Sequence, residues 1–544
     1  MHNDDGAGTL RASPTPDVTV VVAVYNTMPY LTRCLKSVLE QTIGRDRMEI
    51  IAVDDGSTDG SAAELDRLAE AYPATVTVIH QPNSGGPAAP SNRALDRATG
   101  RYVFFLGADD HLGPEALERL VAAADEHGSD VTLGRLVAVN GRYVHQAIFA
   151  SNAVDVDLFD SPLRWSMSNT KLFRRELIER HGLRFPEDMP MLSDQPFTIE
   201  ACLRARRISV LADYPFYYAV RRLDASNITF RPRHEELLRC TTRLMDFVAD
   251  LVGPGKQRDA LLLRHFSWEV AKLLRRDFLW LRRPVQERLY AGVRALAERY
   301  LTEEIARQLD VWERLLFRVA QHGTLDEVIE LLRFEATHGD PPIEPDGDRW
   351  YARYPGFRDP AAGRPDAWFD LTDNAAHWLA KLDATAASWT SGPRGRRALL
   401  VTAHSPVPAL TDRLVRPLRM TVGDAAGTTV EAGPAGVGTR FRVRFEVSDL
   451  LPAGPDDGGL RGVRTQVWTA AGTGGSALVS RDRVTTGRLI VWRGSQLYVL
   501  RATTNHNGRL IVAITPVTLC RVVGQLRRTL SGLRRRPRRG GTTR

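Results

Sequence analysis

The chain has 544 residues, which is too long for one hydrophobic core, so two to four domains are expected. Its four cysteines are widely spaced and no apolar run approaches the roughly 20 residues that cross a bilayer, so we expect neither a disulfide scaffold nor a membrane span. The net charge is +8, but residues 520–544 carry nine arginines and no acid, which leaves about −1 for everything else.

Residues 17–230 predict alternating strands and helices, after a disordered N-terminus over residues 1–16. Apolar runs bounded by polar or Gly-rich turns predict strands at Val18–Val24, Met48–Val53, Val76–Ile79 and Tyr102–Leu106. The segments between them carry apolar residues at helical spacing, such as Leu31, Leu35 and Val38. This order requires a mainly parallel sheet with right-handed crossovers, which is a Rossmann-like α/β fold.

One local turn signal stands out in the second half of this domain. Asn140-Gly141 lies between two apolar stretches, residues 133–139 and 142–149. Because this dipeptide favours tight turns between antiparallel strands, it predicts a β-hairpin.

The rest of the chain divides into four segments with different sequence patterns. Residues 231–338 show helical periodicity, and residues 339–395 are rich in Pro, Gly and Asp, which indicates a linker or irregular segment. Residues 396–519 alternate with a period of two between Gly-rich turns, which is typical of a β-sandwich-like module. Residues 520–544 form the basic tail.

Acidic residues follow two of the predicted strands. Asp54 and Asp55 come after the second strand, and Asp109 and Asp110 after the fourth. Because parallel strands end at one edge of their sheet, these carboxylates are expected close together, where open α/β sheets bind ligands. Such a group suits a divalent metal and a phosphorylated substrate, which indicates a nucleotide-sugar transferase.

Three motifs resemble those of the family-2 glycosyltransferases, which are inverting enzymes with the GT-A fold. The motifs are Val20–Asn26, Val53–Asp59 and Ala108–Asp110, in order and each at a strand end. The resemblance covers roughly residues 18–230. The layout with a helical middle and a β-rich end, together with Ser193–Phe197, is similar to the bacterial glycosyltransferases that decorate wall teichoic acids.

The resemblance implies a UDP-sugar donor site. Asp54 and Asp55 would provide the acceptor for the uracil N3–H, with Asp55 favoured, and Ala23 and Tyr25 would line the same base pocket. Gly85, in the Gly-rich loop after the third strand, lets the backbone approach the nucleotide. The alternative for Asp55 is a turn or helix-capping residue.

The resemblance also implies a divalent metal, Mn²⁺ or Mg²⁺, held by Asp109 with Asp110 beside it. The cation would neutralise the charge that grows on the diphosphate as the sugar leaves. The family usually has a further Asp where this chain has Gly107, so one carboxylate is missing. His111 could assist the metal, and the alternative is a solvated loop histidine.

Inversion needs a general base on the acceptor hydroxyl, and such a base contributes typically 10²–10⁴-fold in rate. Asp194 occupies the position of the family's catalytic Asp; its alternative role, capping the helix at Pro196, is compatible with catalysis. Arg221 and Arg222 match a segment that closes over the diphosphate, where an Arg pairs with phosphate oxygens. The sequence leaves open which of the two points inward.

The acceptor is expected to be a polymer of the cell envelope, such as a teichoic-acid-like polyol phosphate. The loop 184–192, with Phe185, Met189 and Met191, would shape its site. Basic residues near the mouth would favour a polyanion, and they could equally be a solvated face; they are Arg174, Arg175, Arg204, Arg206 and Arg207. A competing interpretation is a catalytically silent nucleotide-sugar or polyanion-binding protein of the envelope, and no nucleic acid is expected.

The location follows from the same features. The N-terminus lacks the basic-then-apolar layout of a signal peptide, so we expect a cytoplasmic protein. The basic tail suits an anionic membrane surface, which predicts peripheral binding at the inner face; its alternative is a disordered, solubilising end. The sequence leaves a homo-oligomer open.

Overall fold

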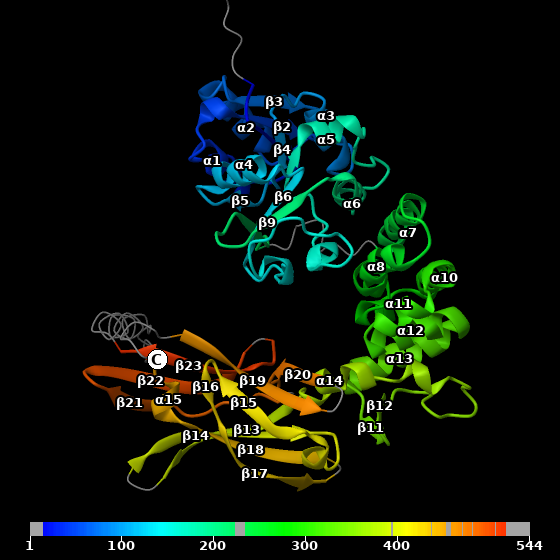
Figure 1. The fold of residues 1–544 in the computed structure, drawn as a ribbon, viewed down its shortest axis with the longest axis vertical. Helices are drawn as coiled ribbons and strands as arrows, with labels where there is room; N and C mark the ends of the chain where they lie inside the picture. Colours follow the sequence, from blue (N-terminus) through cyan, green and yellow to red (C-terminus); the bar gives the residue numbers. More distant parts are fainter. Residues whose placement is uncertain are drawn as a thin grey trace, which may run out of the picture. The chain divides into compact units, whose positions relative to one another are not determined.

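The structure, a computed structural model, describes residues 15–223, 234–392, 395–436, 438–452, 459–469, 472–480, 482–505 and 507–517. The chain forms two compact units, Met1–Leu332 and Arg333–Arg544 (Figure 1). The expectations for a disordered N-terminus and a basic tail fall on residues outside the described ones, apart from residues 15 and 16. Among the described helices, none combines the length and the hydropathy of a bilayer-crossing segment.

The first unit contains a seven-stranded sheet with the order β3-β2-β1-β4-β8-β6-β9. The pairs from β3 to β4 and the pair β6–β9 are parallel, whereas β8 is antiparallel to β4 and β6. The sheet is therefore mainly parallel, as the element order predicted. Its strands are β1 (Val18–Val24), β2 (Met48–Asp54), β3 (Val76–His80), β4 (Tyr102–Phe105), β6 (Val131–Gly134), β8 (Leu172–Arg174) and β9 (Ile208–Leu211).

Helices cover this sheet, and consecutive buried residues along β4 show that both of its faces are covered (Figure 1). The apolar residues that predicted the first helix, among them Leu31, Leu35 and Val38, are all buried. The helices are α1 (Tyr30–Leu39), α2 (Ser61–Ala71), α3 (Ala88–Leu95), α4 (Ala116–His127), α5 (Arg175–Arg180) and α6 (Asp194–Arg204).

A small second sheet brings a late part of the domain to the end of β4. Its order is β5-β10-β7, from β5 (His111–Leu112), β10 (Tyr217–Val220) and β7 (Leu136–Val139). Because β5 follows directly after Asp109 and Asp110, its pairing with β10 places Tyr217 and the residues after it beside these carboxylates.

The hairpin predicted at Asn140-Gly141 is wrong. The turn itself forms, with φ values of 55° and 75° and a hydrogen bond of 3.2 Å from Arg142 N to Val139 O. Residues 142–149 do not continue as a strand, because β7 pairs in parallel with the distant strand β10 instead. A local turn signal carries no information about that competing long-range partner.

The helical prediction for residues 231–338 is confirmed. A π-helical turn, Phe266–Val270, joins α8 to α9. The helices are α7 (His234–Leu251), α8 (Lys256–His265), α9 (Ala271–Leu273), α10 (Arg283–Tyr300), α11 (Glu303–Gln308), α12 (Val311–His322) and α13 (Leu325–His338).

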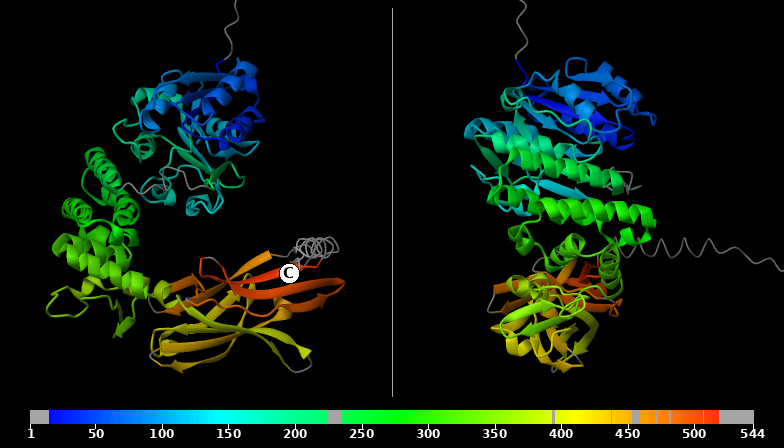
Figure 2. Two further views of the ribbon diagram at one scale, coloured as in Figure 1. Left: turned by 180° about the vertical axis from the view of Figure 1, so that it is seen from behind. Right: turned by 90° about the vertical axis from the view of Figure 1, so that its right-hand side faces the viewer.

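The second unit is built on two mainly antiparallel sheets, drawn as two layers in Figure 2. One has the order β13-β14-β18-β17; the other has the order β16-β15-β19-β23-β22-β21, with β20 beside β19. Along β18 the buried Phe441, Val443 and Phe445 alternate with more exposed residues, which confirms the period-two prediction. Beyond β13 the elements are β14 (Arg397–Ser405), β15 (Arg416–Val422), β16 (Ala425–Ala426), β17 (Thr428–Ala435), β18 (Gly438–Glu446), α15 (Val447–Leu450), β19 (Gly459–Thr469), β20 (Gly472–Ala477), β21 (Leu489–Arg493), β22 (Gln496–Thr504) and β23 (Leu510–Pro516).

Residues 339–395, which the sequence indicated as a linker or irregular segment, contain regular structure. Strand β13 pairs with β14 over its length, so the β-rich module begins before residue 396. Many of the Gly residues lie in turns between these elements, such as Gly347, Gly356 and Gly363, whereas Pro345, Asp346 and Asp383 lie within strands. They are β11 (Ile343–Asp346), β12 (Arg349–Ala352), α14 (Ala375–Leu379) and β13 (Asp383–Ser391).

Candidate active site

The carboxyl ends of the parallel strands bring the acidic residues to one edge of the sheet. Val24 at the end of β1 is in register with Asp54 at the end of β2, and Val21 of β1 with Phe105 at the end of β4. A hydrogen bond of 2.8 Å from Asp55 N to Val24 O extends the pairing of β1 and β2 by one residue. This is the edge where open α/β sheets bind ligands.

Asp54 and Asp55 are buried and hold the surrounding loops. The Asp55 carboxylate accepts hydrogen bonds from Gln81 Nε2 at 2.6 Å, from Ser84 N at 3.0 Å and from Ser84 Oγ at 2.9 Å. Asp54 accepts from Ser57 N at 3.1 Å, and its Oδ2 lies 3.1 Å from His80 Nδ1, an interaction that raises the pKa of His80. Asp55 thus serves the turn role given as its alternative, Asp54 also holds a turn, and a uracil contact stays a prediction.

The side of the edge where a base is expected is open. Tyr25 is 46% exposed, and Ala23 is half-buried. Gly85 has φ +87°, and among the described residues, apart from its chain neighbours, none has an atom within 4 Å of the place of its Cβ. The neighbouring Gly86 is packed, because a Cβ there would lie 2.8 Å from Pro190 Cα. A planar ligand can therefore approach Tyr25 and Gly85.

Gly107 stands where the family usually has an Asp, and a side chain does not fit there. A Cβ would lie 2.7 Å from Asp110 Oδ2 and 3.1 Å from Tyr217 Oη. Asp110 is buried; it accepts hydrogen bonds from Tyr217 Oη at 2.5 Å and from Val220 N at 2.7 Å. Burial and, next, the charge of Asp109 raise the pKa of Asp110 to about 7. Asp110 therefore links the end of β4 to β10.

Asp109 lies at the partly exposed side of the same motif. Its Oδ2 accepts a hydrogen bond from Arg222 Nε at 2.9 Å, and Arg222 Nη1 donates to Asn26 O at 3.0 Å. Arg221 is exposed, and its backbone pairs with Val139 and Asn140. Of the two arginines, Arg222 is thus the one that points into the site.

Asn26 connects the two groups of carboxylates, and sequence reasoning missed this role. It has φ +49°, its N–H donates to Ser57 Oγ at 3.1 Å, and its Oδ1 accepts from Thr58 N at 2.7 Å. Its carbonyl accepts from Arg222. The available signal was an Asn directly after a predicted strand, because Asn is enriched among non-glycine residues with positive φ.

The carboxylates at the sheet edge fit a divalent cation that is bound partly by the protein and partly by the phosphates of the substrate. Within the described ranges, no group of three or more His, Cys, Asp or Glu side chains gathers as a metal site. Mg²⁺ and similar cations are commonly held by one or two carboxylates plus substrate phosphates. Asp109, held by Arg222 at the partly exposed side of the site, can supply such a carboxylate. Asp110 is buried, and its oxygens accept hydrogen bonds from Tyr217 and Val220.

His111 is not the solvated loop histidine given as the alternative, and its help to a metal stays a prediction. It lies in β5 and is buried, with its ring stacked on Tyr218 at 4.6 Å. Its Nε2 lies 2.9 Å from Arg33 Nη2. Burial and then the Arg33 charge lower the pKa of His111 to about 4, so the ring is neutral at ordinary pH.

Asp194 is the first residue of α6. The charged groups that act on it are Arg264, Lys171 and Glu269, and not the carboxylates at the sheet edge. Burial raises the pKa of its carboxyl group, and the positive charges of Arg264 and Lys171 act in the opposite direction. The N-cap of α6 is Ser193, and no side chain makes a capping hydrogen bond. Among the described residues, no side chain donates to the Asp194 carboxylate. The capping alternative is therefore not what the helix uses.

Several residues expected to face the acceptor have structural partners instead. Phe185 and Met189 are buried, and Phe185 stacks on Phe197 with ring centroids 4.3 Å apart. The five candidate arginines pair locally: Arg174 and Arg206 with Asp130, Arg175 with Glu179, Arg204 with Glu200, and Arg207 with Asp155. Their positions favour the interpretation as a paired, solvated face.

The C-terminal unit has a hollow of its own, with a cavity volume of about 820 Å³. Cationic, aromatic and acidic side chains line it, among them Arg353, Lys381, Trp378, His404 and Asp340. Lys381 Nζ lies 3.5 Å from the Trp378 ring centroid and 3.4 Å from Asp340 Oδ1. Sequence reasoning missed this hollow because its wall includes residues from the segment given as irregular.

A mainly parallel sheet with carboxylates at its carboxyl edge defines an open α/β domain of the kind that binds ligands at that edge. The comparisons with known proteins agree: the glycosyl transferase family 2 model matches residues 19–181, and the glycosyl transferase TarS linker domain model matches residues 235–332. The chain belongs to glycosyl transferase family 2.

Characterised relatives share part of the chain. A poly(ribitol-phosphate) beta-glucosyltransferase of Bacillus spizizenii is 40% identical over 205 residues, 38% of this chain and 32% of that protein. The poly(ribitol-phosphate) beta-N-acetylglucosaminyltransferase TarS of Staphylococcus aureus is 34% identical over 256 residues, 46% of this chain and 44% of that protein. The chain thus matches about a third to under a half of the length of these relatives.

Solved structures extend the likeness. S. aureus TarS 1–349 in complex with UDP-GlcNAc has a TM-score of 0.54 and 27% identity, covering 62% of this chain and 97% of that one. S. aureus TarS matches 93% of this chain and 86% of that chain with a TM-score of 0.58 at 20% identity, which shows a shared fold.

Proposed function

We propose that this protein is an inverting glycosyltransferase that moves a sugar from a UDP-sugar to a hydroxyl of a polyol-phosphate polymer of the cell envelope. One observation carries the proposal: two carboxylates with different surroundings. Asp109 pairs with Arg222 at the sheet edge, and Asp194 begins α6 with a raised pKa and without a side-chain hydrogen-bond donor among the described residues. The poly(ribitol-phosphate) transferases among the relatives and the UDP-GlcNAc complex of TarS support the choice of donor and acceptor.

The donor would bind at the edge formed by β1, β2 and β4. Its uracil would lie on the side of Tyr25 and Gly85, and its diphosphate beside Asp109 and Arg222. Arg222 is placed to pair with phosphate oxygens, since guanidinium groups bind phosphate in a bidentate manner. A divalent cation, Mn²⁺ or Mg²⁺, bound by Asp109 would neutralise the leaving diphosphate.

Asp194 would take the proton from the acceptor hydroxyl. A general base is most effective when its pKa lies near the working pH, and the direction of the Asp194 shift brings it closer. The hydroxyl oxygen would then attack the anomeric carbon from the face opposite the diphosphate, which inverts the configuration.

The test is a donor screen with purified protein, a poly(ribitol phosphate) acceptor and UDP release as the readout. Wild-type protein should transfer sugar from one of the UDP-sugars. The variant Asp194→Asn should bind UDP within a few-fold of wild type while its kcat falls by roughly 10² or more. Collapse of UDP binding would make Asp194 a donor-site or structural residue, and wild-type inactivity with every donor would favour the silent-binder interpretation.

A location at the inner face of the membrane is part of the proposal. It rests on the nine arginines of residues 520–544, which lie outside the described residues. Each basic residue near an anionic surface contributes about 1 kcal/mol, and the attraction decays over a Debye length. Full-length protein should therefore co-sediment with anionic vesicles at low salt and less above physiological ionic strength. A chain ending at Leu519 that sediments equally well would leave the tail without a targeting role.

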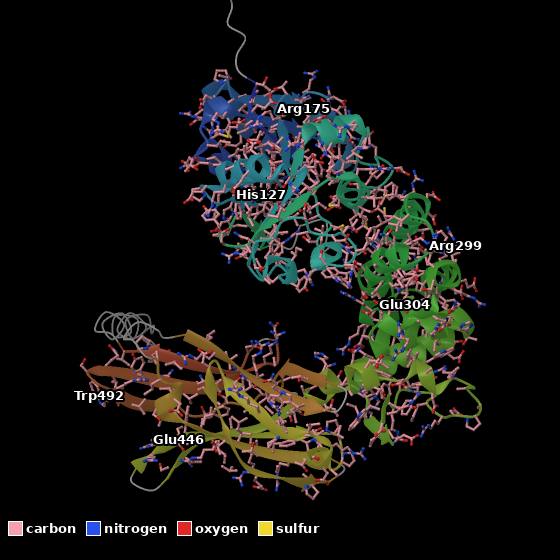
Figure 3. The ribbon with its side chains drawn as sticks, in the orientation of Figure 1. His127, Arg175, Arg299, Glu304, Glu446 and Trp492 are labelled. Carbon is pink, nitrogen blue, oxygen red and sulfur yellow. The ribbon has the colours of Figure 1, made fainter. Side chains whose placement is uncertain are left out.

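Self-association also remains a proposal, to be checked by sedimentation velocity. The observation behind it is that Ile490 and Trp492 of β21 are 62% and 69% exposed (Figure 3 labels Trp492). Strand β21 is at the end of the strand order of the larger sheet, and an exposed edge strand offers unpaired backbone groups to another chain.

A further inference from the structure

The helical segment contributes a buried polar cluster that touches the first turn of α6. The cluster consists of Arg264, His265 and Glu269 from the helical segment and Gln195 from α6. All four side chains are buried, and His265 and Glu269 are almost completely so. Gln195 is the residue next to Asp194, so the cluster is one residue away from the proposed base.

The π-helical turn Phe266–Val270 makes this cluster geometrically feasible. In a regular α-helix each residue advances about 100°, so positions five apart point about 140° away from each other. In a π-turn the hydrogen bonds run from i to i+5, so positions five apart point in more similar directions than in an α-helix. Arg264 Nη1 consequently reaches Glu269 Oε2 at 2.8 Å, and His265 Nδ1 lies 3.1 Å from the same oxygen.

Gln195 closes the contact between the two helices. Its Nε2 donates to Glu269 Oε1 at 3.2 Å, and its Oε1 accepts from Arg264 Nη1 at 2.5 Å. The Gln195 amide therefore hydrogen-bonds to both Arg264 and Glu269, to one with its oxygen and to the other with its nitrogen. Because a side-chain amide can satisfy both only in one orientation, Gln195 and the start of α6 are fixed relative to the helical segment.

The charges of the cluster also act on the Asp194 carboxylate. The groups whose charges act on or with Asp194 are Lys171, Arg264, Lys272 and Glu269. Three of these are basic and one is acidic, so Glu269 is the counter-charge that keeps Arg264 from being neutralised by Asp194. The Arg264 charge and the His265 hydrogen bond outweigh burial and lower the pKa of Glu269 to about 2, so Glu269 stays ionised.

We propose that Glu269 is a positioning residue for the transfer reaction: through Gln195 and Arg264 it holds the first turn of α6 and leaves the Asp194 carboxylate unpaired for the acceptor hydroxyl. This inference rests on the proposed function, because it assigns a helper to the base named there. A purely structural role for the cluster would change stability without changing how the base titrates.

The experiment compares pH profiles of kcat and kcat/KM for wild type and Glu269→Gln with saturating UDP-sugar. The variant keeps the size of the side chain and removes its charge. Arg264 then faces Asp194 without a competing carboxylate, so the acidic limb of the profile should move to lower pH. A weaker base should lower kcat by roughly 10-fold or more, while the UDP dissociation constant stays within about 2-fold.

Two further variants separate positioning from folding. Gln195→Met removes the bridge but leaves the Arg264–Glu269 pair intact, so it should lower kcat even if Glu269→Gln does not fold. Asp246→Asn is the matched control, because Asp246 accepts a hydrogen bond from Tyr300 Oη at 2.5 Å and pairs with Arg299 (labelled in Figure 3) within the same helical segment, away from Gln195. It should lower the Tm without moving the pH profile. Glu269→Asp, which restores the charge, should recover part of the lost kcat.

The outcomes distinguish this inference from the function on which it rests. If wild type is active and both Glu269→Gln and Gln195→Met keep its kcat and pH profile, the positioning role is overturned and the transferase remains. If Asp246→Asn moves the profile as far as Glu269→Gln, the effect is one of general stability and the inference also fails. If wild type transfers no sugar, the proposed function falls and the inference falls with it.

Discussion

Asp109 and Asp110 are neighbours in the chain, yet their surroundings in the site differ. Asp110 is buried, is bonded to Tyr217 and Val220, and has a pKa raised to about 7. Asp109 remains partly exposed and is held by Arg222. The burial of Asp110 and its hydrogen bonds to Tyr217 and Val220 make the two carboxylates different.

The variant Asp109→Asn should abolish transfer and weaken UDP binding in the presence of Mn²⁺. The amide keeps the size of the side chain but loses the charge that would hold the cation and that pairs with Arg222. The measurement is UDP affinity by calorimetry with Mn²⁺ and with excess chelator. Wild-type affinity should drop on chelation and that of the variant should not; full activity of the variant, or of wild type in chelator, would remove the metal from the mechanism.

At the scale of single elements, the apolar runs predicted β1, β2 and β4 closely, because strands buried on both faces need such runs. They also placed Asp54, Asp55 and Asp109 at one edge. The hairpin failed because the partner of β7 is the distant β10. Glu269 was missed since its role depends on a π-turn, and the helical period gives no warning of one. The direction of Arg222 depended on its contact with Asn26, 196 residues away in the chain.

A carboxylate inside α12 gives a prediction for stability. Burial and the charge of Asp310 raise the pKa of Glu313 to about 7 from 4.5. The stability that comes with this raised pKa is present below pH 4.5 and is lost as the pH rises through 7, because the folded state must then hold a buried charge. At 1.36 kcal/mol for each pH unit the loss is on the order of 3 kcal/mol.

The variant Glu313→Gln should therefore melt at a higher temperature than wild type at pH 8 and at nearly the same temperature at pH 4.5. Glu298→Gln is the matched control, since Glu298 is exposed and pairs with Arg294 on α10, and it should show no pH-dependent gain. Thermal unfolding followed by circular dichroism at the two pH values measures this. A gain of equal size at both would mean that the effect is packing and not ionisation.

At the scale of the whole chain, the site residues lie in the first unit, and the hollow lined by Arg353 and Lys381 lies in the second. This chain matches 97% of the solved structure of TarS 1–349. We therefore expect the corresponding part of this protein to fold without the second unit. Cutting the chain after α13 therefore tests whether the proposed chemistry and the proposed polymer binding can be separated. A chemical step needs only one acceptor hydroxyl, whereas a long polyanion can contact cationic side chains far from it.

A chain ending at His338 should accordingly retain UDP-sugar hydrolysis and transfer to short acceptors, and lose efficiency on long ones. The measured quantity is the ratio of kcat/KM for a long poly(ribitol phosphate) to that for a short oligomer. A second binding contact acts through effective concentration, so its loss should lower this ratio by roughly 10-fold or more. Full-length protein with Arg353→Ala and Lys381→Ala tests the hollow itself, and Arg397→Ala, an exposed residue at the start of β14, is the matched control. If the truncated chain keeps the ratio, the second unit has no part in acceptor binding; if only the double variant keeps it, another surface of that unit holds the polymer.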